Sequence, residues 1–323
     1  MNLRQLTLGL LLLLPAAALC RGIVGAARGA ADDAPGRKLH GLSFGPYVAG
    51  QSPEKGSLVT EKQIRDRLAL LRGRTRWIRT YGSDQGLEKV PRIAKGMGFR
   101  VAAGAWVGAG QSDGARQRQL DALRKNVRAG WVDLAVVGSE VVRRGDIPAG
   151  DLVKLMKQFR KQIKAAVPVA TADTNWVLRK QPMLMEASDV VLAHVYPYWD
   201  GVAADRAPAQ LRRQYRALHR LAGKEVIVAE TGWPSAGGSN QAARASADNA
   251  AAYFRAVLDW SEADRVKLFY FEAFDEGWKA GSEGGVGAHW GIFDQDGALK
   301  PGMVAGFKPP PARQERERHP SRP

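Results

Sequence analysis

Cysteine is almost absent from this sequence, since Cys20 is the only one among 323 residues. An intrachain disulfide is therefore excluded, whatever the redox compartment. Histidine is also scarce, and no two histidines share the spacing by which one helix face presents metal ligands. We therefore expect no metal site. The five histidines are His40, His194, His219, His289 and His319.

Acidic residues are in deficit, because 48 Lys+Arg against 32 Asp+Glu give a formal net charge of +16. A strongly basic protein suggests nucleic acid, an anionic membrane or an acidic glycan as a partner. The basic residues are spread along predicted helices, however, and no recognised nucleic-acid-binding motif accompanies them. We therefore favour solvated helix faces, on which lysine and arginine stems lie over the protein surface, and expect no nucleic-acid partner.

The apolar run near the N-terminus, Leu6–Leu14, is too short to span a bilayer comfortably. Arg4 precedes it, and Pro15 and the run Ala16–Ala18 follow, which is the order of a secretory signal. We therefore expect residues 1–20 to be a signal peptide and the protein to be exported, either periplasmic or secreted. The alternatives are an uncleaved anchor or lipidation at Cys20. A membrane contact is expected only through this segment.

The rest of the chain divides into a leader, one domain and a tail. Residues 21–38, rich in Gly, Ala and Arg, predict a flexible leader, and the basic, proline-rich residues 306–323 predict a disordered tail. Residues 39–305 alternate short apolar runs with helical patterns. Strands are expected at Leu39–Gly45, Trp77–Tyr81, Arg100–Trp106, Leu134–Gly138, Val167–Ala172, Val190–Val195, Glu225–Ala229 and Val266–Phe271.

Eight strands with a crossover after nearly every one predict an α/β fold, a single-domain (β/α)8 TIM barrel. A doubly wound sheet is the alternative, but it usually has a glycine-rich phosphate turn after its first strand, and Gly45-Pro46-Tyr47 is not one. The helix after the eighth strand is poorly marked. Helices are expected at Glu61–Leu71, Leu87–Lys95, Ala115–Ala129, Asp151–Ala166, Ala209–Leu221 and Asn240–Trp260.

Two carboxylates directly follow apolar strands, at the barrel end where active sites lie. Glu140 comes after Val136–Ser139, although taken alone it could equally be an ion-pair partner of Arg143 or Arg144. Glu230 follows the strand Val226–Ala229 and leads into Thr-Gly-Trp-Pro, a rigid turn that would hold it in place.

Strands four and seven of such a barrel lie across its mouth, so Glu140 and Glu230 can face each other over a bound sugar. Glycoside cleavage needs such a pair, one to protonate the leaving oxygen and one to attack or stabilise the anomeric carbon. A separation of about 5–5.5 Å permits direct attack and retention, whereas a wider gap admits water and inverts. We predict Glu140 as acid/base and Glu230 as nucleophile. This chemistry requires neither a metal nor an organic cofactor.

Aromatic and polar side chains also gather near the predicted strand ends. Sugar rings present apolar faces that stack on aromatic rings. The simpler interpretation of any single aromatic is loop packing, and we expect that to hold for about half of them. The predicted substrate-binding residues of this group are Tyr47, Tyr81, Trp106, Asn175, Trp176, His194, Tyr196, Trp233 and Trp278.

These residues resemble a known family. The chain is similar to the glycoside hydrolase family 17 β-1,3-glucanases and glucanosyltransferases, particularly their bacterial and fungal cell-wall branch. The resemblance runs from about Leu39 to Lys300, and it implies a retaining mechanism on β-1,3-glucan. The matching stretches are Phe44–Pro53, Ile78–Tyr81, Val137–Glu140, Glu230–Ser235 and Phe271–Lys279.

The resemblance also implies that Glu276 and Lys279 lie beside the site, with Glu283 as a further acidic candidate. Many members carry Asn before the acid/base, where this chain has Ser139, whose hydroxyl can make a similar but shorter-reaching contact with the sugar. We expect Glu140 to begin protonated, its pKa raised by the charge of Glu230. Hydrolysis and transfer remain open, a non-catalytic glycan-binding barrel is the alternative, and oligomeric state is not predicted.

Overall fold

The computed structural model describes residues 36–307, so the expected signal peptide and nearly all of the expected leader and tail lie outside the described residues. Eight parallel strands close into a barrel in the order β1-β10-β7-β6-β5-β4-β3-β2. The predicted barrel is confirmed, and the doubly wound alternative is wrong because the sheet has no open edge. The strands are β1 (Leu39–Ser43), β2 (Thr75–Arg79), β3 (Arg100–Ala105), β4 (Leu134–Ser139), β5 (Val169–Thr174), β6 (Val191–His194), β7 (Val226–Thr231) and β10 (Leu268–Tyr270).

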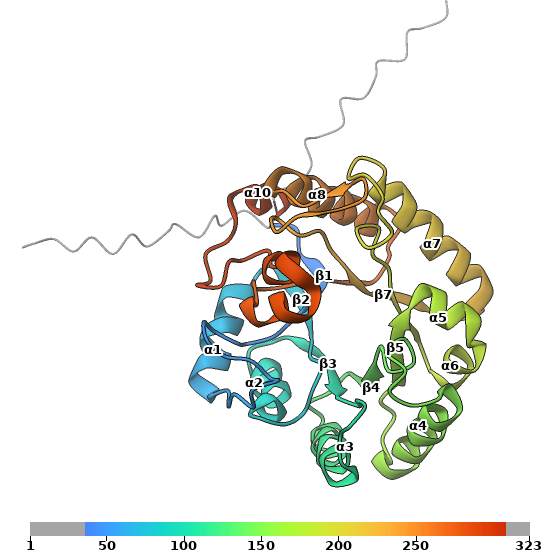
Figure 1. Cartoon of the computed structure of the whole chain (residues 1–323). Coiled ribbons are helices and arrows are strands. Elements are labelled where there is room, and N and C mark those ends of the chain that lie inside the picture. The colour runs from blue at the N-terminus through green and yellow to red at the C-terminus, as the bar shows by residue number, and fades with distance from the viewer. Residues whose placement is uncertain (1–35, 308–323) are drawn as a thin grey trace, which may run out of the picture. The chain divides into compact units, whose positions relative to one another are not determined.

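Helices surround this barrel (Figure 1). Three of them begin where the sequence offers a hydroxyl cap: Thr60, Ser112 and Ser246 each accept a hydrogen bond from a first-turn backbone N–H. The second predicted helix is a 3₁₀ turn, η1 (Leu87–Lys89), that continues into α2 (Val90–Gly96). The other long helices are α1 (Glu61–Leu71), α3 (Asp113–Arg128), α4 (Ala149–Ile163), α7 (Ala207–Ala222) and α8 (Ala247–Ala263).

The structure differs from the predicted helices in three places. The helix expected from Asn240 begins only at Ala247, because β8 (Ser239–Asn240) and β9 (Ala243–Arg244) first form a small hairpin. Two short helices, α5 and α6, follow β5, and a proline at the start of α6 keeps them apart. After β10 the glycine-rich chain forms short turns in place of one helix. Their bounds are α5 (Asn175–Lys180), α6 (Pro182–Ala187), η2 (Gly277–Lys279), α9 (Ala280–Glu283), η3 (Gly284–His289), α10 (Pro301–Val304) and η4 (Ala305–Phe307).

The core has two layers, as a barrel of this kind requires. Small and branched side chains fill the barrel interior, among them Ala102, Val136, Leu192 and Ile227, with Phe269. A larger apolar cluster lies between the strands and the surrounding helices. Within residues 36–307, no helix combines the length and the apolar character that a bilayer span needs.

Candidate active site

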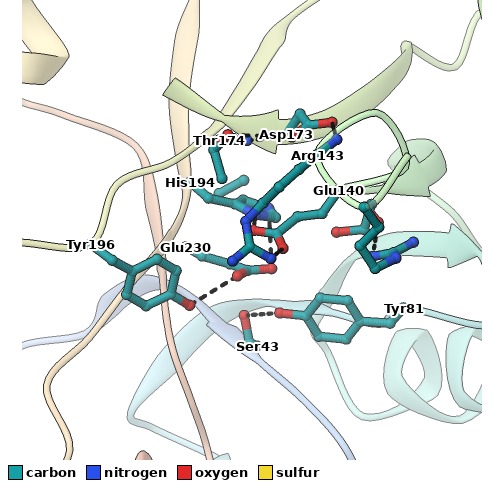
Figure 2. Close-up of polar contacts among 12 residues, drawn as sticks. Ser43, Tyr81, Glu140, Arg143, Asp173, Thr174, His194, Tyr196 and Glu230 are labelled. Atoms are coloured by element: carbon teal, nitrogen blue, oxygen red, sulfur yellow. Dashed lines mark hydrogen bonds and ion pairs between the residues drawn. The ribbon is translucent and has the colours of Figure 1, made fainter. Parts of the chain in front are cut away.

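The ends of four strands bring charged side chains together at the C-terminal end of the barrel (Figure 2). Arg79 ends β2, Glu140 directly follows β4 and His194 ends β6. Glu230 is the second-last residue of β7. One side-chain oxygen of each glutamate and one ring nitrogen of His194 all lie within 4.8 Å of one another. Both predicted catalytic carboxylates therefore face one small space.

The backbone around Glu140 is irregular, and this irregularity places its side chain. The register between β4 and β5 shifts after Val136, and Gly138 and Glu140 both have positive φ, 77° and 54°. A non-glycine residue in this region costs about 1–3 kcal/mol and is found where the surroundings enforce it. Here the Glu140 N–H donates to the carbonyl of Ala172 at 2.8 Å, which fixes the loop against β5.

Asp173, at the end of β5, holds the same loop from the other side. Its Oδ2 accepts hydrogen bonds from the backbone N–H groups of Val142 at 3.2 Å and Arg143 at 3.3 Å. Arg143 in turn donates from Nη1 to Glu140 Oε2 at 2.8 Å. The ion pair considered from the sequence therefore exists, and it lies inside the candidate site (Figure 2).

Glu230 is held by two donors, one on each oxygen. Arg79 Nη1 donates to Oε1 at 2.6 Å, and the Tyr196 hydroxyl donates to Oε2 at 2.9 Å. Burial, and then the charge of Glu230, raise the pKa of Tyr196 well above its ordinary value, so the phenol stays protonated and remains a donor. A carboxylate fixed in this way keeps one orientation toward a bound substrate.

Arg79 is a site residue that the sequence reasoning missed. Its side chain is 1% exposed, and besides Glu230 it reaches the Ser139 hydroxyl from Nη2 at 3.0 Å. Its guanidinium carbon also lies 4.6 Å from the centre of the Tyr81 ring. The available signal was an arginine at the end of an apolar strand in Ile78–Tyr81, because a buried charge needs a partner nearby.

His194 connects the two carboxylates. Its Nδ1 lies 2.8 Å from Glu140 Oε1, and its Nε2 lies 3.1 Å from Glu230 Oε1 and 3.2 Å from Arg79 Nη2. The predicted substrate-binding role of His194 stays a prediction, whereas its contacts place it between the two acids. It can fix the spacing of the pair.

The three residues with ligand-type atoms, Glu140, His194 and Glu230, also have a spacing that could hold a metal ion. The charges around them argue for another use. Arg79 and Arg143 already form close ion pairs with the two carboxylates at 2.6 and 2.8 Å, and a cation would have to displace them. The donor set is therefore better explained as a network that orients two acids.

The electrostatics of Glu140 overturn one expectation. Burial alone would raise its pKa, but the hydrogen bond and charge of His194, followed by the charge of Arg143, outweigh burial and lower the pKa to about 2. The prediction that Glu140 begins protonated is therefore wrong for the free protein. His194 and Arg143 both contact its carboxylate, and together they lower its pKa by more than the neighbouring charge of Glu230 raises it.

The pKa of Glu140 makes folding stability depend on pH. Because the folded-state pKa of about 2 lies below the ordinary 4.5, the stabilisation is present above about pH 4.5 and is lost as the pH falls through 2. We expect Arg143→Gln to lower the free energy of unfolding by about 1 kcal/mol at neutral pH, since Arg143 is half-exposed. The difference from the wild type should persist at mildly acidic pH and disappear as the pH falls through about 2.

Urea unfolding across this pH range measures the effect. The matched control is Arg116→Gln on α3, which removes an i,i+3 partner from the exposed Asp113. A destabilisation by Arg143→Gln that stays constant as the pH falls through about 2 would show that Arg143 does not act through the Glu140 carboxylate.

The turn after Glu230 explains why the sequence Thr-Gly-Trp-Pro follows it. A Cβ on Gly232 would meet the carbonyl oxygen of Phe271 at 2.1 Å, so only glycine allows β7 and β10 to approach here. Trp233 is 0% exposed and donates from Nε1 to the Arg244 carbonyl at 2.9 Å. The prediction that Trp233 contacts substrate is wrong in this structure, because its ring has no free face. It packs beneath the turn.

We expect Gly232→Ala to destabilise the protein by about 1–3 kcal/mol, because the added methyl overlaps backbone that cannot move independently. Thermal or urea unfolding measures this. Gly150→Ala is the matched control, since a Cβ at this position in α4 meets nothing within 4 Å. Equal stability of the two variants would contradict the proposed packing of the turn.

A second cluster of buried groups comes from the segment that follows β10. Lys279 Nζ contacts Glu272 and lies 2.8 Å from Glu276 Oε2, with all three side chains buried. Sequence reasoning did not select Glu272 as a site residue. Burial raises the pKa of Glu272 well above its ordinary value. The network implied around Glu276 and Lys279 thus also includes Glu272, which forms an ion pair with Lys279.

Several buried polar atoms of this region make no hydrogen bond within residues 36–307. They are the Tyr47 hydroxyl, the Trp278 Nε1 and one oxygen each of Glu272 and Glu276. The Tyr47 and Trp278 rings pack edge to face with centroids 6.4 Å apart. Buried polar groups without a partner are costly, so these atoms are available to hydroxyl groups of a ligand or to water.

The remaining predicted contacts lie in different surroundings. Tyr81 donates to Ser43 Oγ at 2.9 Å inside the network, as Figure 2 shows. Trp106 and Trp176 are 38% and 53% exposed, so each has ring surface free for a sugar. Asn175 is buried, and its side-chain nitrogen donates to Gln214 on α7 at 3.3 Å. A contact of Asn175 with substrate stays a prediction.

Glu283, the acidic candidate implied by the resemblance, accepts a hydrogen bond from Trp290 Nε1 at 2.9 Å. It lines a hollow of about 320 Å³ together with Tyr198, Trp199 and the β8 hairpin. Burial raises its pKa, and the charges of Glu230 and Glu140 also contribute. Glu283 is therefore held at the edge of this hollow by Trp290.

Comparison with known proteins gives matches across most of this domain. A family profile described as the BtgE/BtgC glycoside hydrolase domain matches residues 41–291. A glucan 1,3-beta-glucosidase of Arthroderma benhamiae is 33% identical over 226 residues, which cover 63% of this chain and 71% of that protein. A probable beta-glucosidase btgE of Aspergillus flavus is 28% identical over 263 residues, 79% of this chain but only 42% of that protein.

Solved structures give the same picture. The glycoside hydrolase family 17 beta-1,3-glucanosyltransferase from Rhizomucor miehei has a TM-score of 0.72 and 30% identity, covering 82% of this chain and 96% of its own. An active-site mutant of the Rhizomucor miehei beta-1,3-glucanosyltransferase in complex with laminaritriose has a TM-score of 0.73 and 29% identity, with 84% and 97% covered.

Proposed function

The chain belongs to the BtgE/BtgC glycoside hydrolase family, and from that premise we propose that it is an enzyme that cleaves or transfers β-1,3-linked glucan with retention of configuration. The substrate class rests on the names of its relatives, a glucan 1,3-beta-glucosidase and a beta-1,3-glucanosyltransferase. The observation that carries the mechanism is the pair of facing carboxylates on β4 and β7.

The spacing of the carboxylates supports retention. An oxygen of Glu140 lies within 4.8 Å of an oxygen of Glu230. Retaining glycosidases have their two carboxyl groups about 5–5.5 Å apart, and inverting enzymes leave about 6.5–9.5 Å for a water. Carboxylate oxygens this close favour the retaining arrangement, in which Glu230 itself attacks the anomeric carbon.

The reaction then proceeds in two displacements. A Glu230 oxygen bonds to the anomeric carbon while the glycosidic C–O bond breaks and the leaving oxygen takes a proton from Glu140. In the second step an acceptor hydroxyl gives its proton to Glu140, and its oxygen displaces Glu230. Water as acceptor gives hydrolysis, and a glucan hydroxyl gives transfer.

Glu140 must acquire its proton when substrate binds, because it is a carboxylate in the free protein. Arg143 is half-exposed whereas His194 is fully buried, so Arg143 is the donor that a glucan can displace from Glu140. Removing that positive charge raises the pKa of Glu140 toward the range in which it acts as an acid.

The exposed rings of Trp106 and Trp176 are suited to stack on an incoming glucan acceptor.

Analysis of the products from laminari-oligosaccharides tests the proposed activity. We expect fragments shorter than the substrate from hydrolysis, longer or branched products from transfer, or both. Glu230→Gln protein, treated identically, supplies the blank. Unchanged oligosaccharide with the wild-type protein would favour a glycan-binding barrel without catalysis.

We also propose that the protein is exported, and fractionation of a cell that expresses the full chain tests this.

A further inference from the structure

The end of the barrel opposite the two carboxylates carries exposed basic residues on segments that lead into the strands. We call this set the basic end and define it as Lys38, Arg72, Arg76, Lys164 and Arg265. They lie before or at the beginning of β1, β2, β5 and β10, and parallel strands begin at the same end of a barrel. Widely separated parts of the sequence thus place positive charge on one surface.

Most acidic side chains at this end are already paired, although Glu186 at the end of α6 is exposed and forms no ion pair within residues 36–307. Within residues 36–307, none of the five basic-end residues forms an ion pair, so their charges are not compensated by neighbours. The paired acidic side chains have other basic partners: Asp133 with Lys95 at 3.1 Å and Arg100 at 3.4 Å, Asp189 with Arg160 at 3.1 Å, Glu225 with Lys267 at 2.5 Å, and Asp264 with Arg216 at 3.2 Å.

Helix ends explain only part of this charge. Helix C-termini favour cations within the last turn, and Arg72 and Lys164 occupy the C-cap positions of α1 and α4. Lys38 precedes β1, however, and Arg76 lies inside β2, so neither caps a helix. These positions carry positive charge without a contact inside the folded domain that requires it.

Both ends of the described chain lie at the same surface. The Arg37 N–H donates to the Phe307 carbonyl at 3.0 Å, immediately before β1 begins. The sequence upstream contains the apolar run Leu6–Leu14, and residues 308–323 hold five Lys and Arg against two Glu. Leu221, 55% exposed, ends α7 beside Arg220 on this side. Charge, an exposed aliphatic side chain and the path of the chain therefore coincide.

We propose that the basic end docks onto an anionic lipid bilayer, with the catalytic end of the barrel directed away from it. Lys38, Arg72 and Arg76 have no negatively charged partner within residues 36–307, and the phosphate headgroups of the bilayer would provide one. Nucleic acid fits less well. The tryptophans that are more than a third exposed follow the C-terminal ends of strands at the catalytic end, Trp176 in α5 and Trp106 and Trp199 on loops, so the basic end has no such ring for base stacking.

Vesicle binding by the full chain tests this proposal. The probes are vesicles of phosphatidylglycerol with phosphatidylcholine, and vesicles of phosphatidylcholine alone. We compare the wild type with a variant in which Lys38, Arg72, Arg76 and Lys164 are all changed to Gln. Each basic residue near an anionic bilayer contributes roughly fivefold to binding, so we expect a loss of about 100-fold or more on anionic vesicles.

A second variant shows whether vesicle binding depends on where the basic residues lie or only on the total charge of the protein. Lys55, Arg118, Lys157 and Arg213 are exposed and form no ion pair within residues 36–307, but they lie on the catalytic end or the flanks. Changing these four to Gln lowers the net charge equally, from +16 to +12 (16 − 4). We expect this control to lose about fivefold at most. Unfolding curves and laminarin activity of the basic-end variant should match the wild type.

Three results would overturn the proposal. Equal losses in the two variants would show that only net charge matters. Equal wild-type binding to both kinds of vesicle would assign attachment to the N-terminal apolar segment. Tighter binding to duplex DNA than to anionic vesicles, lost with the same four residues, would assign the surface to nucleic acid. None of these outcomes depends on the proposed glucan activity.

Discussion

Glu230→Gln should reduce turnover of laminari-oligosaccharides by roughly 10⁴-fold or more, because the amide cannot form the covalent bond on which both steps depend. The side chain keeps its shape and an oxygen that can accept from Arg79. It loses the charge that compensates a buried guanidinium, so we also expect a destabilisation of about 3 kcal/mol. Steady-state kinetics together with urea unfolding measure both effects.

The same strand offers a matched control. Glu225 directly precedes β7 at its other end, where it forms a half-exposed ion pair with Lys267. Glu225→Gln makes the same chemical change and should leave activity unaltered, with a stability loss of about 1 kcal/mol at most. Near-normal activity of Glu230→Gln would rule out its assignment as nucleophile.

Glu140→Gln should lower kcat by about 10²–10⁴-fold on glucan, the usual contribution of general acid–base catalysis. The loss should depend on the leaving group, because a nitrophenolate needs no proton to depart. For a dinitrophenyl glucoside we therefore expect formation of the glucosyl-enzyme to remain fast and its breakdown to become limiting, which produces a burst of dinitrophenolate. Stopped-flow absorbance measures that burst.

Asp151→Asn, a carboxylate-to-amide change in the first turn of α4, is the control for this variant. Asp151 is exposed and belongs to the same strand–helix unit as Glu140, so it should retain full activity on both substrates. An equal loss on glucan and on the dinitrophenyl glucoside would contradict an acid/base role for Glu140 and favour a purely structural one.

The sequence predicted the parts of this fold that depend on local pattern. Short apolar runs, most of them separated by helical patterns, marked all eight strands, and carboxylates directly after two runs marked Glu140 and Glu230. Contacts between distant segments were not visible in the same way. The position of Arg79 against Glu230, for example, depends on the closed barrel bringing the ends of β2 and β7 together.

Trp233 and Glu140 illustrate two further limits. The sequence shows that an aromatic follows a strand, but only packing decides whether its ring meets substrate or fills the space beneath a turn, as Trp233 does. The pKa of Glu140 depends on which neighbour is closest. The charge of Glu230 was foreseeable, whereas the direct contacts of His194 and Arg143 required the three-dimensional arrangement.

A covalent bond between Glu230 and the sugar can be detected by trapping the glucosyl-enzyme. A 2-deoxy-2-fluoro laminaribiosyl fluoride slows both displacements while keeping a good leaving group, so the glucosyl-enzyme should accumulate. Mass spectrometry of the digested protein should find one added laminaribiosyl group on the peptide that contains Glu230, and none in Glu230→Gln. An adduct on another residue, or turnover of natural glucan with inversion and no adduct, would rule out Glu230 as the nucleophile.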